Sequence, residues 1–200
     1  MNKTKKAWAA GLIAALLATG ATGWCASGNP VDITVTVTVS QLSITASNRN
    51  DETDTVAFGT KLAGSNSVAA DPVSVTNSGN VTETYSLVIP SEPNLTWASI
   101  DSGSPAAEQY KLSAVFRAPA AAAPGTGDYD DNDAFKVGAG KTATGADNLA
   151  VNGDTGGDGT KGYKMAANAN LYMWLKFHAP SATAITTQQS IVARITAATP

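Results

Sequence analysis

Apolar side chains recur at every second position along much of the chain after residue 30. The clearest case is segment 31–39, in which five Val or Ile residues alternate with four Asp or Thr residues. A strand places successive side chains on opposite faces, whereas a helix needs apolar residues spaced by about 3.6 positions. No stretch after residue 30 shows the helical spacing clearly. The sequence therefore predicts an all-β fold.

The same alternation predicts further strands, separated by turn residues. After residue 39 the apolar positions change from odd to even numbers at Leu42 and Ile44, which indicates a bulge near Ser40–Gln41. The turn 77–80 (Asn-Ser-Gly-Asn) is expected to join strands 72–76 and 82–89 into a hairpin. Seven or more short strands without helices between them favour an antiparallel β-sandwich. The other predicted strands are 109–117, 171–178 and 189–197, with a weaker element at 95–100.

Alternation also assigns the inward-facing side chains of these strands. Strand 171–177 is apolar on both faces, so one face should join the core. The other face should either lie beneath a loop or form an aromatic platform, and burial is the expected outcome. The inward positions predicted for the other strands are Val73, Val75, Tyr85, Leu87, Ile89, Tyr110, Leu112, Ala114, Phe116, Ile191, Ala193 and Ile195.

Between residues 118 and 165 the alternation lapses, and the chain becomes rich in Ala, Gly and Asp. A featureless loop of this length is unusual in a compact domain. We therefore expect an irregular insertion that contains short strands near 134–137 and 149–151.

The amino-terminal residues 1–26 are typical of a secretory signal peptide. Three lysines precede the apolar run 7–18, and small residues follow. The run is too short to span a bilayer, so we expect a cleaved signal helix, cut after Gly23 or near Ala26. Residues 27–200 would then form one domain without a transmembrane span. The predicted location is secreted, periplasmic or on the surface of a bacterium.

Cys25 has two interpretations. A lipid-modified cysteine would follow a small residue at the cleavage point, but Trp24 precedes this one. Cleavage after Ala26 would instead leave a mature chain without cysteine.

The net charge and the numbers of cysteine and histidine residues exclude several classes of function. The formal net charge is −3 and becomes −6 when the three signal lysines are removed, which argues against nucleic-acid binding. One cysteine excludes an intrachain disulfide framework, and one histidine excludes a poly-histidine zinc site.

The segment 73–87 carries the pattern V-x-V-x-N-x-G followed by Y-x-L. It resembles secreted bacterial immunoglobulin-like domains, in which this pattern forms two paired strands. The closing stretch 171–197, with Pro180 and Gln188-Gln189, is similar to the end of those domains. A comparable hairpin also makes the chain similar in architecture to the TasA and camelysin matrix proteins. The resemblance covers roughly residues 30–117 and 170–198, and it implies a fold rather than an activity.

Aspartates concentrate in the insertion, where the run 128–133 offers oxygen ligands at alternate positions, as Ca²⁺ prefers. The run lacks the Gly and Glu of an EF-hand loop, and the segment 152–159 could add further ligands. The alternative is a solvated turn, because Asp and Asn favour loop conformations. The possible calcium ligands are Asp128, Asp130, Asn132 and Asp133; no other cofactor is predicted.

The leading function hypothesis is an exported non-enzymatic structural or cell-surface protein, such as a matrix, envelope or filament subunit. Self-association or other surface proteins are its expected partners. The alternative is a calcium- or carbohydrate-binding module that uses the 118–165 insertion. A hydrolase would need His178 as a general base, but no G-x-S-x-G nucleophile elbow accompanies it. Segment 31–39 could be the first strand of its own sandwich, or it could insert into a neighbouring molecule.

Overall fold

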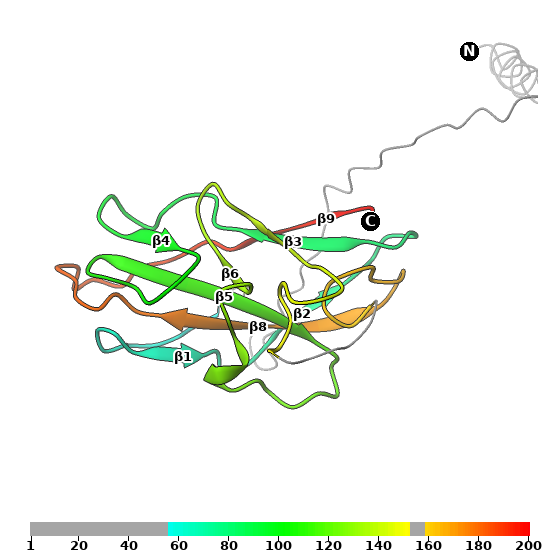
Figure 1. Cartoon of the computed structure of the whole chain (residues 1–200), viewed down its shortest axis with the longest axis horizontal. Helices are drawn as coiled ribbons and strands as arrows, with labels where there is room; N and C mark the ends of the chain where they lie inside the picture. Colours follow the sequence, from blue (N-terminus) through cyan, green and yellow to red (C-terminus); the bar gives the residue numbers. More distant parts are fainter. Residues whose placement is uncertain (1–55, 153–158) are drawn as a thin grey trace, which may run out of the picture. The chain divides into compact units, whose positions relative to one another are not determined.

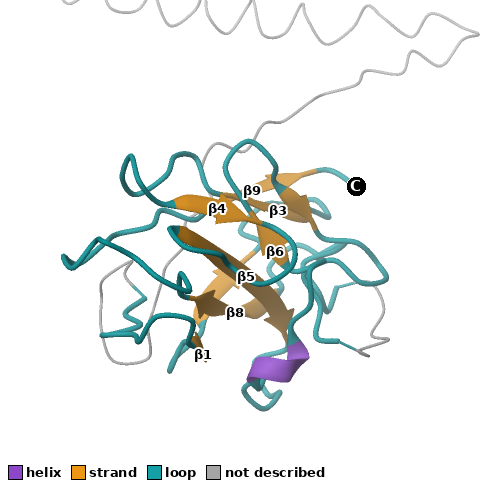
Figure 2. Cartoon of the chain, turned by 60° about the vertical axis from the view of Figure 1, so that its left-hand side comes forward, coloured by secondary structure: helices purple, strands orange, loops and turns teal. Residues whose placement is uncertain are grey.

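The computed structural model describes residues 56–152 and 159–200, and over these ranges the chain is almost entirely β (Figures 1 and 2). The all-β prediction is confirmed. The predicted signal peptide 1–26, the predicted strand 31–39 and the predicted bulge near 40–41 lie outside the described residues. No helix within the described ranges has the length and apolar character of a membrane span. The elements are β1 (Asn66–Val68), β2 (Val73–Thr76), β3 (Thr84–Val88), β4 (Ala98–Ile100), β5 (Gln109–Arg117), η1 (Thr126–Asp128), β6 (Ala134–Phe135), β7 (Lys141–Thr142), β8 (Asn170–His178) and β9 (Arg194–Ala198).

The larger sheet is built around β5 and β8, the two nine-residue strands. They pair antiparallel from Lys111 opposite His178 to Arg117 opposite Tyr172. Strands β1 and β2 share the other edge of β8, while β4 and β6 share the other edge of β5 (Figure 1). Both central strands are therefore paired on both sides.

One pair in the larger sheet is parallel, which corrects the prediction of a purely antiparallel fold. Strand β4 runs parallel to β5, with Ala98 opposite Gln109 and Ile100 opposite Lys111. A parallel connection usually needs a dozen or more residues. Here β4 has only three residues, so the loop 101–108 is long enough to return the chain to the start of β5.

The smaller sheet has the order β7-β3-β9. Strands β2 and β3 are both present, but the predicted hairpin between them is wrong. Strand β2 pairs with β8 in the larger sheet, whereas β3 pairs with β7 and β9. The turn 77–80 therefore carries the chain from one sheet to the other. The paired strands that the family resemblance implies for this segment are corrected in the same way.

Side chains from both sheets meet in one hydrophobic cluster, as the alternation predicts. Burial of these side chains is the main favourable contribution to folding. Ile191 and Ala193 are only half-buried, because they precede the paired part of β9. The buried predicted positions are Val73, Val75, Tyr85, Leu87, Ile89, Tyr110, Leu112, Ala114, Phe116 and Ile195.

The insertion contains one of the two strands expected in it. Strand β6 confirms the strand near 134–137, although it covers only two residues. The strand near 149–151 is wrong, because these residues form a turn in which Leu149 has φ 59°. The backbone N–H of Phe116 nevertheless donates to the carbonyl of Leu149 at 3.0 Å, so this turn still covers the edge of β5.

Candidate functional site

The acidic insertion lies against the outer face of the larger sheet, opposite the main core. Val115 on β5 faces Trp174 on β8 in the strand register, and both pack against Tyr129 of the insertion. Val151, farther along the insertion, packs on the same cluster. Burial of the second face of strand 171–177 beneath a loop is therefore confirmed, and an aromatic platform at Trp174 is not formed.

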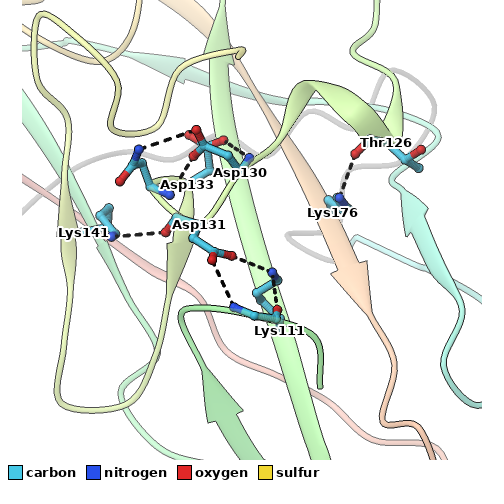
Figure 3. Close-up of polar contacts among 9 residues, drawn as sticks. Lys111, Thr126, Asp130, Asp131, Asp133, Lys141 and Lys176 are labelled. Carbon is cyan, nitrogen blue, oxygen red and sulfur yellow. Dashed lines mark hydrogen bonds and ion pairs between the residues drawn. The ribbon is translucent and has the colours of Figure 1, made fainter. Parts of the chain in front are cut away.

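Asp131 attaches the acidic loop to the sheet. Its Oδ1 lies 2.9 Å from Nζ of Lys111 on β5, and its Oδ2 accepts the backbone N–H of Gly103 at 3.0 Å (Figure 3). Lys141 also donates to the backbone carbonyl of Asp131 at 3.4 Å. The Gly103 hydrogen bond and the Lys111 ammonium hold the pKa of Asp131 below its usual value. Through these contacts, the Asp131 carboxylate connects the insertion to β5 and to the loop after β4.

A second attachment is made by Lys176 on β8. Its Nζ donates to the carbonyl of Thr126 at 2.7 Å (Figure 3). The same Nζ lies 5.4 Å from the ring centroid of Tyr129. Partial burial lowers the pKa of Lys176. The ammonium therefore bridges the sheet and the η1 turn through one hydrogen bond and one cation–π contact.

Asp133 is fully buried at the base of the loop, just before β6. Its two carboxylate oxygens accept the backbone N–H groups of Asp130 at 2.9 Å and Ala150 at 3.0 Å. Burial raises the pKa of Asp133 to about 7, although these two hydrogen bonds oppose the shift. The buried carboxylate therefore links the acidic run 128–133 to the turn at 149–151, both within the insertion.

The other predicted calcium ligands also bond within their own loop. Asp128 accepts the backbone N–H of Gly125 at 2.8 Å, and Asp130 accepts the backbone N–H of Asn132 at 2.7 Å. In the described part of the chain, no three His, Cys, Asp or Glu side chains form a group that could hold a metal ion. The Nδ2 of Asn132 donates to Oδ2 of Asp130 at 3.5 Å. The four predicted residues are thus close in sequence, but the three aspartates accept hydrogen bonds that define the loop.

Sequence reasoning missed a buried polar junction between the two sheets. The Nδ2 of Asn77 donates to the carbonyls of Val81 at 2.8 Å and Met165 at 2.9 Å, and its Oδ1 accepts the N–H of Gly79. Glu83 is buried beside this junction, and burial raises its pKa. The turn sequence 77–80 was the available signal, but it indicated only a local turn.

A cavity of about 410 Å³ opens on the smaller sheet. Hydroxyl groups from β3 and β7 line it, and the Oγ of Ser86 lies 2.8 Å from Oγ1 of Thr142. The insertion also contributes Tyr163 and Lys164 to the wall. The site therefore offers hydroxyl groups beside one aromatic ring.

His178 ends β8, opposite Lys111 on β5 and Asn66 on β1. Partial burial and the charge of Lys111 lower its pKa. The imidazole therefore stays mostly neutral near pH 7, in a position between paired strands.

Comparison with protein-family models, curated proteins and solved structures found no match to this chain.

Proposed function

We propose that this chain is an exported, non-enzymatic structural protein of a bacterial envelope, surface or extracellular matrix, built as an immunoglobulin-like β-sandwich. Cleavage of residues 1–26 would release the mature protein outside the cytoplasm. Self-association or contact with other surface proteins would then be its mode of action.

The observation that carries this proposal is the way in which the acidic insertion uses its polar groups. Asp131 and Asp133 bond to the sheet and to backbone N–H groups, and Lys176 bonds back to the insertion. These groups fasten a loop over a hydrophobic face, which favours a structural role for the most polar part of the fold. The resemblance of segment 73–87 to secreted bacterial domains supports the same class of protein.

Fractionation of the source bacterium, followed by electron microscopy of the purified protein, tests this proposal. We expect mature protein that begins after Gly23 or near Ala26, located in the periplasm, in a surface coat or in extracellular fibres. Uncleaved protein confined to the cytoplasm would contradict the proposal.

We also propose that the run 128–133 is a structural loop, because its carboxylates accept backbone hydrogen bonds. Calorimetric titration with Ca²⁺ separates this role from a calcium site. We expect no heat of binding from the natural protein. Binding that disappears when the acids at 128, 130 and 133 are changed to Asn would assign a calcium site instead.

A second candidate function is saccharide binding at the cavity on the smaller sheet. Sugars combine hydroxyl groups with apolar C–H faces, and the cavity presents Ser86, Thr142 and the Tyr163 ring together. Part of the wall comes from the 118–165 insertion, where a binding module was expected. The cavity thus supports the carbohydrate alternative by its chemistry.

Binding to an array of bacterial and plant glycans tests this second function. A saccharide ligand of the cavity should bind the natural protein and lose at least about tenfold in affinity in Tyr163→Ala, which corresponds to about 1.4 kcal/mol. Leu95→Ala serves as the control, since Leu95 is exposed and does not line the cavity. Equal binding by both variants would exclude the cavity as the binding site.

A further inference from the structure

The smaller sheet carries a row of hydroxyl groups on the face that points away from the core, called here the hydroxyl face. Leu87 on β3 and Ile195 on β9 lie opposite each other and are buried, so the residues before and after them point outward. The cavity on this sheet opens on the same face. Each hydroxyl can donate and accept hydrogen bonds. The hydroxyl-bearing residues of this face and of the cavity wall are Thr84, Ser86, Thr142, Thr196 and Thr199.

A positively charged residue lies at each end of the hydroxyl face. Arg194 begins β9 and is exposed. It lies opposite Val88 and two positions before Thr196, so its side chain is on the outward face. At the other end, the backbone N–H of Lys164 donates to Oγ1 of Thr84 at 3.2 Å, and Lys164 lines the cavity.

The spacing of these two residues suits an extended ligand. Arg194 and Ala198 are four positions apart on β9, which is about 13 Å along a strand. Ala198 lies opposite Thr84, the residue that accepts the Lys164 N–H. A ligand of several sugar units is therefore long enough to reach both charges.

The charges on the hydroxyl face favour an anionic ligand. Lys164 is the only charged side chain among the described residues that line the cavity, and these include no Asp or Glu. Arg194 forms no ion pair with a described residue, whereas Lys111 and Lys136 are each paired with an aspartate. The chain as a whole has a formal net charge of −3, so two positive charges on one face are a local exception.

Sugars that carry a carboxylate match this arrangement. Their carboxylate can pair with a guanidinium or ammonium group, and their hydroxyls can bond to the Ser and Thr side chains. Their apolar C–H face can lie on the Tyr163 ring, which is 5.1 Å from Nζ of Lys164. We propose that the hydroxyl face binds chains of uronic acids, with Lys164 and Arg194 contacting the carboxylates. This inference rests on saccharide binding at the cavity, the second candidate function.

Binding of polyuronates and of their carboxyl-reduced forms tests this inference. Polygalacturonate, alginate and hyaluronan supply different uronic acids, and in each reduced form a hydroxymethyl group replaces the carboxylate. We expect at least one polyuronate to bind the natural protein and its reduced form to bind at least about tenfold more weakly. The affinity should also fall as the ionic strength rises, because salt screens exposed charges.

Variants that each remove one positive charge locate the contact. Lys164→Gln and Arg194→Gln should each weaken polyuronate binding about two- to fivefold, as expected for an ion pair near the surface. Lys61→Gln is the matched control, because Lys61 is exposed in the segment before β1 of the larger sheet and its loss changes the net charge equally. This control should leave the affinity unchanged.

The possible failures separate this inference from the candidate function beneath it. Equal losses in Lys61→Gln and Arg194→Gln would overturn the inference, since net charge alone would then explain the binding. Equal affinity for a polyuronate and its reduced form, with both lost in Tyr163→Ala, would overturn the acidic ligand but not saccharide binding. Absence of polyuronate binding would overturn this inference alone if the glycan array identifies a neutral ligand, and both if it identifies none.

Discussion

At the scale of single residues, Gly162 shows how closely the backbone approaches the core. It has φ 74°, and a Cβ at this position would lie 2.7 Å from Cδ2 of Phe116. Gly138 has the same φ, but a Cβ there would meet nothing within 4 Å. The two positions therefore separate backbone strain from steric overlap.

We expect Gly138→Ala to destabilise the fold by about 1–2 kcal/mol through backbone strain alone. Gly162→Ala should lower the free energy of unfolding by about 1–3 kcal/mol more than Gly138→Ala does, because the methyl group must displace the Phe116 ring. Urea unfolding of the two variants measures the difference. Equal losses would show that the ring moves aside without cost.

Glu83 makes the stability of the fold depend on pH. Burial raises its pKa in the folded state, so the unfolded chain releases this proton at lower pH than the folded chain does. The contribution of Glu83 to the free energy of unfolding is therefore greatest below its ordinary pKa. It declines as the pH rises through the raised pKa of the folded state. We expect Glu83→Gln to gain stability relative to the natural protein between pH 4 and pH 7.

Urea midpoints measured across this pH range check the effect of Glu83. Asp147→Asn, at an exposed position, is the control for the loss of one carboxylate. A constant difference between Glu83→Gln and the natural protein at all pH values would contradict the assignment.

At the scale of elements, the turn after β2 depends on one buried amide. Asn77 makes three side-chain hydrogen bonds, and its backbone also pairs with the 165–169 loop. Asn77→Ala leaves the backbone groups that this amide bonds without partners, which should lower the free energy of unfolding by about 1–3 kcal/mol. Asn94 also makes three side-chain hydrogen bonds but is partly exposed, so water can replace it in Asn94→Ala.

Thermal unfolding compares the two variants directly. We expect Asn77→Ala to lower Tm clearly more than Asn94→Ala does. A larger loss for Asn94→Ala would mean that burial of the amide is not what stabilises the turn.

Alternation predicted β2, β3, β5 and β8 because each places apolar residues on a buried face. It could not identify β1 and β7, because two or three residues carry no measurable period. It also gave the wrong partner for β3, since the turn after Thr76 resembles a hairpin turn whether or not the strands then pair. In the acidic loop, residue types suggested ligands, but only the fold shows that Asp133 is buried between two backbone N–H groups.

At the scale of the whole molecule, two tryptophans report on the two sides of the larger sheet. Trp97 packs against the main core, near Tyr110 and Phe177, whereas Trp174 lies under the insertion. If the insertion folds with the sheet as one unit, both sides should unfold together. We therefore expect the unfolding transitions reported by Trp97 and by Trp174 to have the same midpoint as the unfolding of the sheets.

In a chain that lacks residues 1–26, and therefore Trp8 and Trp24, the variants Trp97→Phe and Trp174→Phe each retain one tryptophan. The fluorescence midpoint of each variant should equal its own midpoint by far-UV circular dichroism. An earlier fluorescence transition in Trp97→Phe, which retains Trp174, would show that the insertion detaches before the sheets unfold.

The position of β8 has a consequence for the lifetime of the protein. Its two edges are paired and its central residues are covered on both faces, so a protease or a solvent proton reaches them only when much of the fold opens. Hydrogen exchange at Leu171–Phe177 should therefore be the slowest in the chain and should report the free energy of global opening. This strand would then determine how long each folded molecule survives in the presence of a protease.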